Sequence, residues 1–267
     1  MAKRPLALIT GASAGLGMEF AKQLAAKGID LVLSARRLDR LEALAETLSA
    51  EHKVKVSCFA LDLSLPDAVD QLEAAMSAQR WRFDWVVNNA GYGLTGTFSS
   101  RTWEEHQAFL RVLLEVPTRL THLVLPRMQK RGYGRVVNVA SLAGLVPSTA
   151  GHTLYGAVKS YLVRFSQSLA QELEGSGVNV SALCPGFTYT EFHDVNATRA
   201  KVSRLPRFMW QDAETVVRCG IQAVEQGEVI CVPGRWNQFV RALTKALPEQ
   251  LALRLVKSKS DEFRSVD

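Results

Sequence analysis

The chain has 267 residues, 47% of them hydrophobic, so it can bury a large core, and its length is typical of one α/β domain. The formal net charge of +6 comes from lysines and arginines scattered without a basic tract, so it is interpreted as surface solvation and no nucleic-acid partner is expected. The four cysteines lack CxxC spacing and disulfide-scaffold density, which predicts a reduced, cytoplasmic setting without a metal site. No apolar run reaches the roughly 18 residues of a membrane-spanning helix.

Short apolar segments rich in β-branched residues alternate with longer segments of helical period along most of the chain. The segments read as strands are 5–10, 29–34, 54–60, 83–89, 134–140, 178–184 and 228–233. The helical patterns between them cover 17–27, 38–49, 67–78, 103–131, 153–173 and 213–226. This alternation predicts one doubly wound α/β domain over 1–267, with a core of about 5–234 and a central parallel sheet of about seven strands.

Two segments fall outside the alternation. Residues 187–211 are long and of mixed polarity between a strand and a helix, which is typical of a substrate-covering loop. Residues 235–267 form a C-terminal tail with apolar residues at helical spacing. The tail could cover the substrate, contact a subunit or lie on a membrane surface with its basic flanks. Because Pro248 interrupts the apolar stripe, packing on its own domain or on another subunit is preferred over the membrane.

A glycine-rich segment, TGASAGLG (10–17), joins the first strand to the first helix. Its glycines at 11, 15 and 17 permit a tight turn, allow close approach of a pyrophosphate, and aim a helix N-terminus at it. This position at the start of a βαβ series predicts a Rossmann-type dinucleotide site.

The second strand ends in Ser34-Ala35-Arg36-Arg37, where NAD-binding domains usually carry an acidic residue for the ribose 2′-hydroxyl. Arg36 suits a 2′-phosphate instead, so NADP is preferred over NAD, although Arg36 could simply begin a solvated helix. Asp62, after the third strand, could accept a hydrogen bond from the adenine amino group or cap a turn.

Together these segments resemble the classical short-chain dehydrogenase/reductase family over nearly the whole chain. The matching motifs, in the family's order, are TGASAGLG (10–17), Asp62, NNAG (88–91), Ser141, YGAVK (155–159) and PGFTYT (185–190). The resemblance implies an NADP(H)-dependent oxidoreductase that interconverts a carbonyl and an alcohol, and a homodimer or homotetramer.

The resemblance also implies roles for three residues. Carbonyl reduction needs a proton donor and a group that holds the developing oxyanion. Tyr155 would donate the proton, and Ser141 would donate a hydrogen bond to the substrate oxygen. A phenol with a pKa of about 10 is a poor acid at neutral pH. Lys159, one helical turn away, would lower that pKa with its positive charge and also hold the nicotinamide ribose.

The remaining assignments follow the family motifs. The expected cofactor contacts are Gly11, Ser13, Gly15, Leu16, Gly17, Arg36, Asp62, Asn89, Ala90, Gly91, Tyr155, Lys159, Pro185, Gly186 and Thr190. The expected substrate pocket contains Tyr92, Leu142, Phe187 and Phe192. These apolar residues favour a lipophilic ketone, aldehyde or acyl-chain substrate, the alternative being that they are core residues.

One family residue is missing. Many members carry an asparagine in the helix after NNAG, where a helix irregularity lets a main-chain carbonyl hold a water that links the lysine to solvent. Here that position is Leu113. Because Pro117 has no N–H, the carbonyl of Leu113 lacks its normal helical donor and could still bind the water. The hypothesis is a weakened catalyst, and the alternative is a non-catalytic or weakly active dinucleotide-binding or sensing protein.

Overall fold

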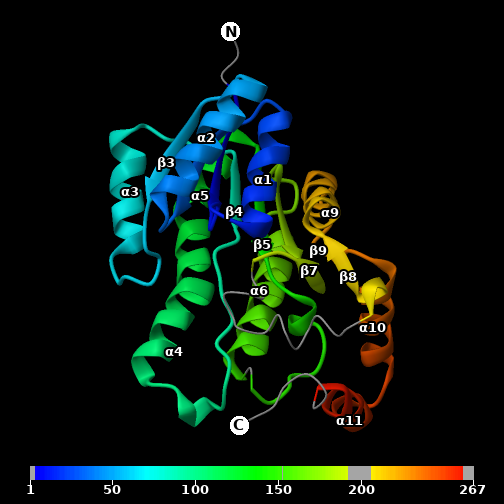
Figure 1. Ribbon diagram of the computed structural model, residues 1–267. Helices are drawn as coiled ribbons and strands as arrows, with labels where there is room; N and C mark the ends of the chain where they lie inside the picture. Colours follow the sequence, from blue (N-terminus) through cyan, green and yellow to red (C-terminus); the bar gives the residue numbers. More distant parts are fainter. Residues whose placement is uncertain (1–3, 152, 192–205, 261–267) are drawn as a thin grey trace.

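The central sheet confirms the predicted α/β class. The computed structural model describes residues 4–151, 153–191 and 206–260 (Figure 1). Seven parallel strands lie in the order β3-β2-β1-β4-β5-β6-β9. They are β1 (Leu6–Thr10), β2 (Asp30–Ala35), β3 (Val56–Ala60), β4 (Trp85–Asn88), β5 (Gly134–Val139), β6 (Val178–Leu183) and β9 (Ile230–Cys231). The strand order reverses direction between β1 and β4, and the carboxyl ends of strands at such a switch point form a crevice for ligands.

Helices cover both faces of this sheet (Figure 1). One layer contains α1 (Gly15–Ala26), α2 (Leu38–His52) and α9 (Ala213–Gln226), and the other contains α3 (Ala68–Ala78), α4 (Trp103–Leu110), α5 (Val116–Arg131) and α6 (Thr153–Glu172). Successive strand residues point to opposite faces, so Ala7 and Ile9 join the core under α1 while Leu8 joins the core under α5. Burial on both faces explains why the strands read as continuous apolar runs.

The predicted helix 103–131 is not continuous. Between α4 and α5 the chain makes a π-helix, Arg111–Glu115, in which the N–H of Val116 donates to the carbonyl of Arg111, five residues earlier. Pro117 follows directly, and its missing N–H helps to explain why regular α-helical bonding does not run through this point. The irregularity is present although the family's asparagine is replaced by Leu113.

The sequence predicts a loop over 187–211, but the ends of this segment are not loop. Its two ends form a parallel two-stranded sheet, β7 (Phe187–Tyr189) with β8 (Trp210–Asp212). Three-residue strands are too short to show a hydrophobic period, which explains why the sequence pattern missed them. Phe192, expected in the substrate pocket, lies outside the described residues.

The C-terminal tail forms two helices, α10 (Arg235–Ala246) and α11 (Glu249–Ser260), with Pro248 between them. The buried side of α10 carries Asn237, whose Nδ2 donates to the carbonyl of Pro233 at 2.8 Å. The apolar stripe is only partly covered, because the ring of Phe239 is 54% exposed. Within the described ranges, no helix combines the length and apolar character that crossing a bilayer needs.

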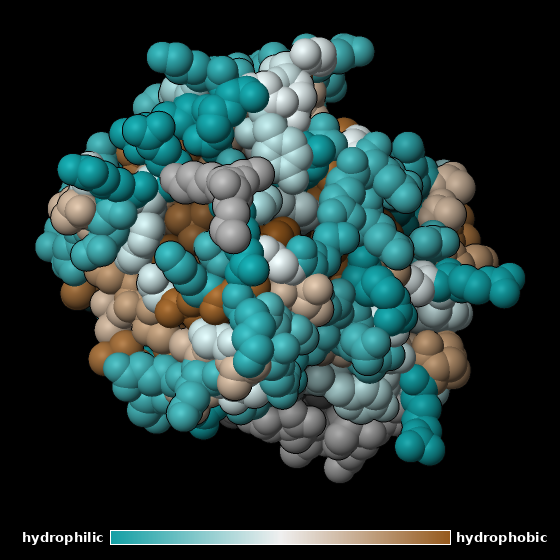
Figure 2. Space-filling model, turned by 90° about the horizontal axis from the view of Figure 1, so that it is seen from above, coloured by the Kyte–Doolittle hydropathy of each residue, from teal (hydrophilic) through white to brown (hydrophobic). Residues whose placement is uncertain are grey.

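Hydrophilic residues dominate the end of the molecule that is seen from above in Figure 2. Apolar residues show there only in small areas between the polar ones. Polar residues outside and apolar residues in the core are the usual distribution in a globular domain.

Candidate active site

The turn after β1 can be made only with glycine at its main positions. Gly11 and Gly15 have φ angles of 67° and 56°, in the left-handed region that other residues avoid. A Cβ at Gly17 would collide with the carbonyl oxygen of Gly11 and the side chain of Asn89. Backbone N–H groups and the N-terminus of α1 are thereby brought close to the crevice, where a pyrophosphate could be held.

Hydrogen bonds join this turn to the segment after β4. The hydroxyl of Thr10 accepts from the N–H groups of Asn89 and Ala90 at 3.0 and 3.1 Å, and Asn89 Nδ2 donates to the carbonyls of Thr10 and Gly11 at 2.9 and 3.2 Å. Gly91 follows in the same segment, and a Cβ added there would contact the side chain of Leu113. The two walls of the switch-point crevice are therefore fixed to one another.

A second network joins the central strands to α6. Asn88 Nδ2, at the end of β4, donates to Asn138 Oδ1 at 2.8 Å, and Asn138 Nδ2 donates to Ser166 Oγ at 2.9 Å. All three residues are buried, so each bond compensates for lost hydration. The network sets the position of α6, the helix that carries Tyr155 and Lys159.

The structure brings Tyr155 and Lys159 together and places Ser141 at the end of the adjacent strand. The Lys159 ammonium lies 5.6 Å from the centre of the Tyr155 ring. Ser141 begins a short 3₁₀ turn (Leu142–Gly144), and its Oγ accepts from the N–H of Ala143 at 3.1 Å. An oxygen that accepts in this way keeps its hydroxyl hydrogen for another acceptor, as a donor to a substrate carbonyl requires.

Lys159 is almost fully buried and donates to the carbonyl of Val139 at 2.7 Å. Burial lowers the pKa of Lys159 to about 8, because removal from water disfavours the charged ammonium. A lysine held near its titration point, next to a phenol in a crevice, is a combination found at functional sites far more often than in structural helices.

A small cavity separates Lys159 from the π-helix. It leaves about 10 Å³ for the centre of a water molecule, which is enough for one water. Its lining includes Asn88, Leu113, Pro117 and Lys159. The Oδ1 atom of Asn88 is buried and has no hydrogen-bond partner among the described residues. The wall of the cavity therefore contains two polar residues, Asn88 and Lys159, that suit a bound water.

The π-helix changes the backbone hydrogen bonding beside this cavity. The N–H of Val116 is used by Arg111, and Pro117 has no N–H. The carbonyls of Val112 and Leu113 therefore lose the donors that an α-helix would supply. The regular helix that the sequence predicts would remove the donor of Leu113 alone.

Two arginines follow β2, where the sequence predicts the adenosine end of the cofactor, and the sequence predicts a cofactor contact only for the first, Arg36. Arg36 lies near Asp62, where burial alone would raise the pKa of Asp62, but hydrogen bonds from Ser64 and the charge of Arg36 outweigh that effect and lower it. Asp62 Oδ1 accepts from Ser64, so it does cap a turn, and its contact with adenine stays a prediction. Arg37 reaches the glycine turn and donates to Ser13 Oγ at 3.1 Å. The doubled arginine at 36–37 was the signal for this second residue.

The segment after β6 closes the other side of the crevice. Pro185 accepts from the N–H of Leu142 at 2.9 Å, which links it to the turn that begins at Ser141. A Cβ at Gly15 would contact the side chain of Thr190, so this segment passes beside the glycine turn. Gly186 faces Asn237 of α10, with no room for a Cβ.

The three expected substrate residues that the structure describes, Tyr92, Leu142 and Phe187, are all half-buried. Tyr92 packs edge-on against Phe109 with ring centres 5.4 Å apart, and burial raises its pKa. Leu142 is partly buried against the core beside β6, and the ring centres of Phe187 and Trp210 are 5.6 Å apart. Tyr92 therefore serves the core at least in part, the alternative that the sequence left open.

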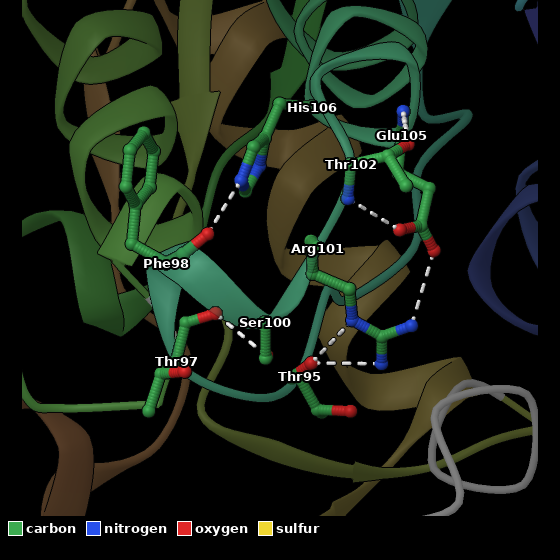
Figure 3. A network of polar contacts seen from close by, with 8 residues as sticks. All are labelled: Thr95, Thr97, Phe98, Ser100, Arg101, Thr102, Glu105 and His106. Atoms are coloured by element: carbon green, nitrogen blue, oxygen red, sulfur yellow. Dashed lines mark hydrogen bonds and ion pairs between the residues drawn. The ribbon is translucent and has the colours of Figure 1, made fainter.

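The wall that follows Tyr92 is held by polar contacts (Figure 3). Arg101 donates to the carbonyl of Thr95 at 2.9 and 3.0 Å and pairs with Glu105 at 3.1 Å, while His106 Nε2 donates to the carbonyl of Phe98 at 2.9 Å (Figure 3). A small pocket lies between this segment and Leu154, the neighbour of Tyr155. These contacts hold the segment in one conformation beside the N-terminal end of α6.

The donor set fits a dinucleotide. The glycine cradle, the two arginines and the buried ammonium match the polar parts of such a ligand. The described ranges contain no group of three histidine, cysteine or acidic side chains arranged for a metal ion.

Comparisons with known proteins agree with this geometry. The model of the short chain dehydrogenase family matches residues 5–200. A sulfoacetaldehyde reductase from Chromohalobacter salexigens is 39% identical over 186 residues, 69% of this chain and 72% of that protein. A ketoacyl reductase, HetN, from Nostoc sp. is 35% identical over 242 residues, 90% of this chain and 82% of that protein. A short-chain dehydrogenase from Sphingobium yanoikuyae, solved in complex with NADPH, gives a TM-score of 0.79 at 31% identity, covering 92% of this chain and 97% of that chain.

The fold and the comparisons define an oxidoreductase of the α/β class. The chain belongs to the short-chain dehydrogenase/reductase family, whose members act on CH–OH groups with a nicotinamide cofactor. The resemblance drawn from the motifs is therefore confirmed, while the roles of individual residues stay predictions.

Proposed function

We propose that the protein reduces the carbonyl of an apolar substrate with NADPH. The observation that carries the proposal is the buried Lys159 ammonium 5.6 Å from the ring of Tyr155 in the switch-point crevice. Such a pair is needed where a phenol must give up its proton near neutral pH.

The protein groups divide the work as follows. Ser141 donates a hydrogen bond to the substrate oxygen and stabilises the negative charge that grows on it. Tyr155 transfers its hydroxyl proton to that oxygen, which becomes the alcohol O–H. Lys159 stabilises the phenolate left on Tyr155 through its positive charge. The bound cofactor supplies the hydride that forms the new C–H bond.

Two arginines support NADPH over NADH. Arg36 and Arg37 lie at the adenosine end, and Arg37 reaches Ser13 of the glycine turn. A guanidinium can bind a phosphate through two hydrogen bonds at once. The Sphingobium neighbour with bound NADPH is consistent with this choice. Gly11, Gly15, Leu16 and Gly17 would contact the pyrophosphate, and Gly186 and Thr190 the nicotinamide.

Substrate class is proposed from the residues that the family motifs place beside the substrate. Leu142, Phe187 and the Trp210 ring near Phe187 would give an apolar lining, which favours a lipophilic ketone, aldehyde or acyl chain. The ketoacyl reductase relative fits this class, and the sulfoacetaldehyde reductase shows that small charged substrates also occur among relatives.

The test is a panel of lipophilic ketones, aldehydes and acyl thioesters with sulfoacetaldehyde as the charged comparison, each run with NADPH and with NADH. Faster NADPH oxidation with the lipophilic members would support the proposal. Tight NADPH binding with no turnover on any substrate would instead support the alternative function, a non-catalytic dinucleotide-binding or sensing protein. Leu113, in place of the family asparagine, is the one residue that favours this alternative.

The proton supply to Lys159 gives a separate prediction. The cavity beside Lys159 already has room for one water, so Leu113→Asn should raise turnover only modestly. The expected gain in kcat is on the order of threefold, which corresponds to less than about 1 kcal/mol of activation free energy. Leu114→Asn, at the neighbouring partly buried position, is the matched control and should not raise it. Steady-state kcat of the folded variants measures the effect, and an unchanged kcat for Leu113→Asn would contradict the role given to this position.

The pKa of Lys159 gives a pH prediction. Lys159 carries its charge below about pH 8 and loses it above, so kcat/KM for reduction should fall above about pH 8. Lys159→Arg cannot lose its charge in that range, so its remaining activity should decline only at higher pH. The pH profiles of both proteins test this, and the same alkaline limb in both would assign the titration to another group.

We further propose that the chain acts as one catalytic domain in the cytoplasm and assembles as a homodimer or homotetramer. The exposed Phe239 on α10 provides apolar area for a subunit contact. Light scattering coupled to gel filtration tests the assembly, and a monomer at all concentrations would exclude it.

A further inference from the structure

A carboxylate of the protein itself, that of Glu191, pairs with Arg37 at the proposed adenosine end of the crevice and with Arg40 of α2. Arg40 Nη1 lies 3.0 Å from each carboxylate oxygen of Glu191, and Arg37 Nη1 lies 3.6 Å from one of them. The same Arg37 donates to Ser13 Oγ through Nη2. Glu191 directly follows Thr190, the residue beside the glycine turn. Segments far apart in the sequence therefore meet at one anion-binding position.

These ion pairs are open to solvent. The side chains of Arg37, Arg40 and Glu191 are 43%, 44% and 48% exposed. Exposed pairs contribute little stability, because water competes for both partners. A ligand anion with more charge than a carboxylate, such as a phosphate monoester, could therefore replace Glu191 at small cost.

We infer that Glu191 is a specificity-determining residue that competes with the 2′-phosphate of the cofactor for Arg37 and Arg40. This inference rests on the proposed use of NADPH. If Glu191 stays in place, it repels the phosphate, and if it moves away, its two ion pairs are lost. Both effects weaken binding of a 2′-phosphorylated adenosine, and neither acts on an adenosine that lacks this phosphate.

Removing the charge of Glu191 tests its competition with the 2′-phosphate directly. Glu191→Gln keeps the size of the side chain and should bind adenosine 2′,5′-bisphosphate about three- to tenfold more tightly than the unmodified protein. Binding of adenosine 5′-monophosphate should change less than about twofold. Isothermal titration calorimetry measures both, and the difference should shrink as salt is raised.

Two variants serve as controls. Glu225→Gln also removes an exposed carboxylate from an ion pair, that with Lys27 at 3.0 Å, and should leave both affinities unchanged. In a background that carries both Arg37→Gln and Arg40→Gln, Glu191→Gln should lose most of its gain, because both guanidinium groups under competition are gone.

The outcomes separate this inference from the proposed function. Unchanged or weaker binding of the bisphosphate to Glu191→Gln, with the bisphosphate still preferred over the monophosphate, would overturn the competition and leave the NADPH proposal standing. No preference for the bisphosphate in either protein would overturn the choice of NADPH and the competition with it.

Discussion

Tyr155→Phe is expected to lower kcat/KM for carbonyl reduction by about 10²- to 10⁴-fold, the usual contribution of a general acid. The substitution removes only the hydroxyl, so the ring, the helix α6 and the neighbouring Lys159 are retained. Affinity for the cofactor should change much less than the rate. The measurement is steady-state kinetics on the best substrate of the panel, together with a binding titration of NADPH.

Tyr161→Phe is the matched control on the same helix. The Tyr161 hydroxyl makes a hydrogen bond with Thr118 Oγ1 at 2.8 Å. Losing that bond should reduce stability by about 0.5–1.5 kcal/mol and leave kcat/KM nearly unchanged. If Tyr155→Phe kept more than a tenth of the activity, another group would have to be the proton donor.

Gly17→Ala should have the largest effect on folding. The added Cβ would meet the backbone carbonyl of Gly11 and the Asn89 side chain, neither of which can move without breaking the link between β1 and β4. Overpacking of this kind costs roughly 3 kcal/mol. For a chain of this size that corresponds to a drop in Tm of about 6–12 °C. Thermal unfolding followed by circular dichroism measures the drop.

Gly220→Ala provides the comparison. Gly220 is also a buried helical glycine, but its Cβ would meet the end of the Leu183 side chain, which can shift. Its Tm should fall less than that of Gly17→Ala. Equal losses in the two variants would mean that the turn at Gly17 is less constrained than the contact indicates.

The sequence predicted the parts of the molecule whose residue patterns are local, that is, formed by residues close together in the chain. The strands are buried on both faces, so they read as apolar runs, and the glycine turn needs residues that tolerate left-handed backbone. Tyr155 and Lys159 lie one turn apart on a helix, so their proximity follows from spacing alone. The family motifs then supplied the expected roles.

The features that the sequence missed depend on contacts between distant segments or on small energy differences. The pairing of Glu191 with Arg37 and Arg40 joins residues about 150 positions apart in the chain. The π-helix at Arg111–Glu115 differs from an α-helix by one hydrogen-bond step, and no residue type specifies it uniquely. The strand pair β7 and β8 is too short to produce a pattern.

The close approach of Gly186 and Asn237 makes the C-terminal tail a structural part of the candidate active site. Asn237 of α10 fills the space that a Cβ at Gly186 would need, and it also holds Pro233 at the base of its own helix. A chimaera that exchanged the tail for that of a relative would therefore have to transfer the partner of Gly186 as well. Any redesign of the tail is thus coupled to the backbone at Gly186, which is proposed to contact the nicotinamide.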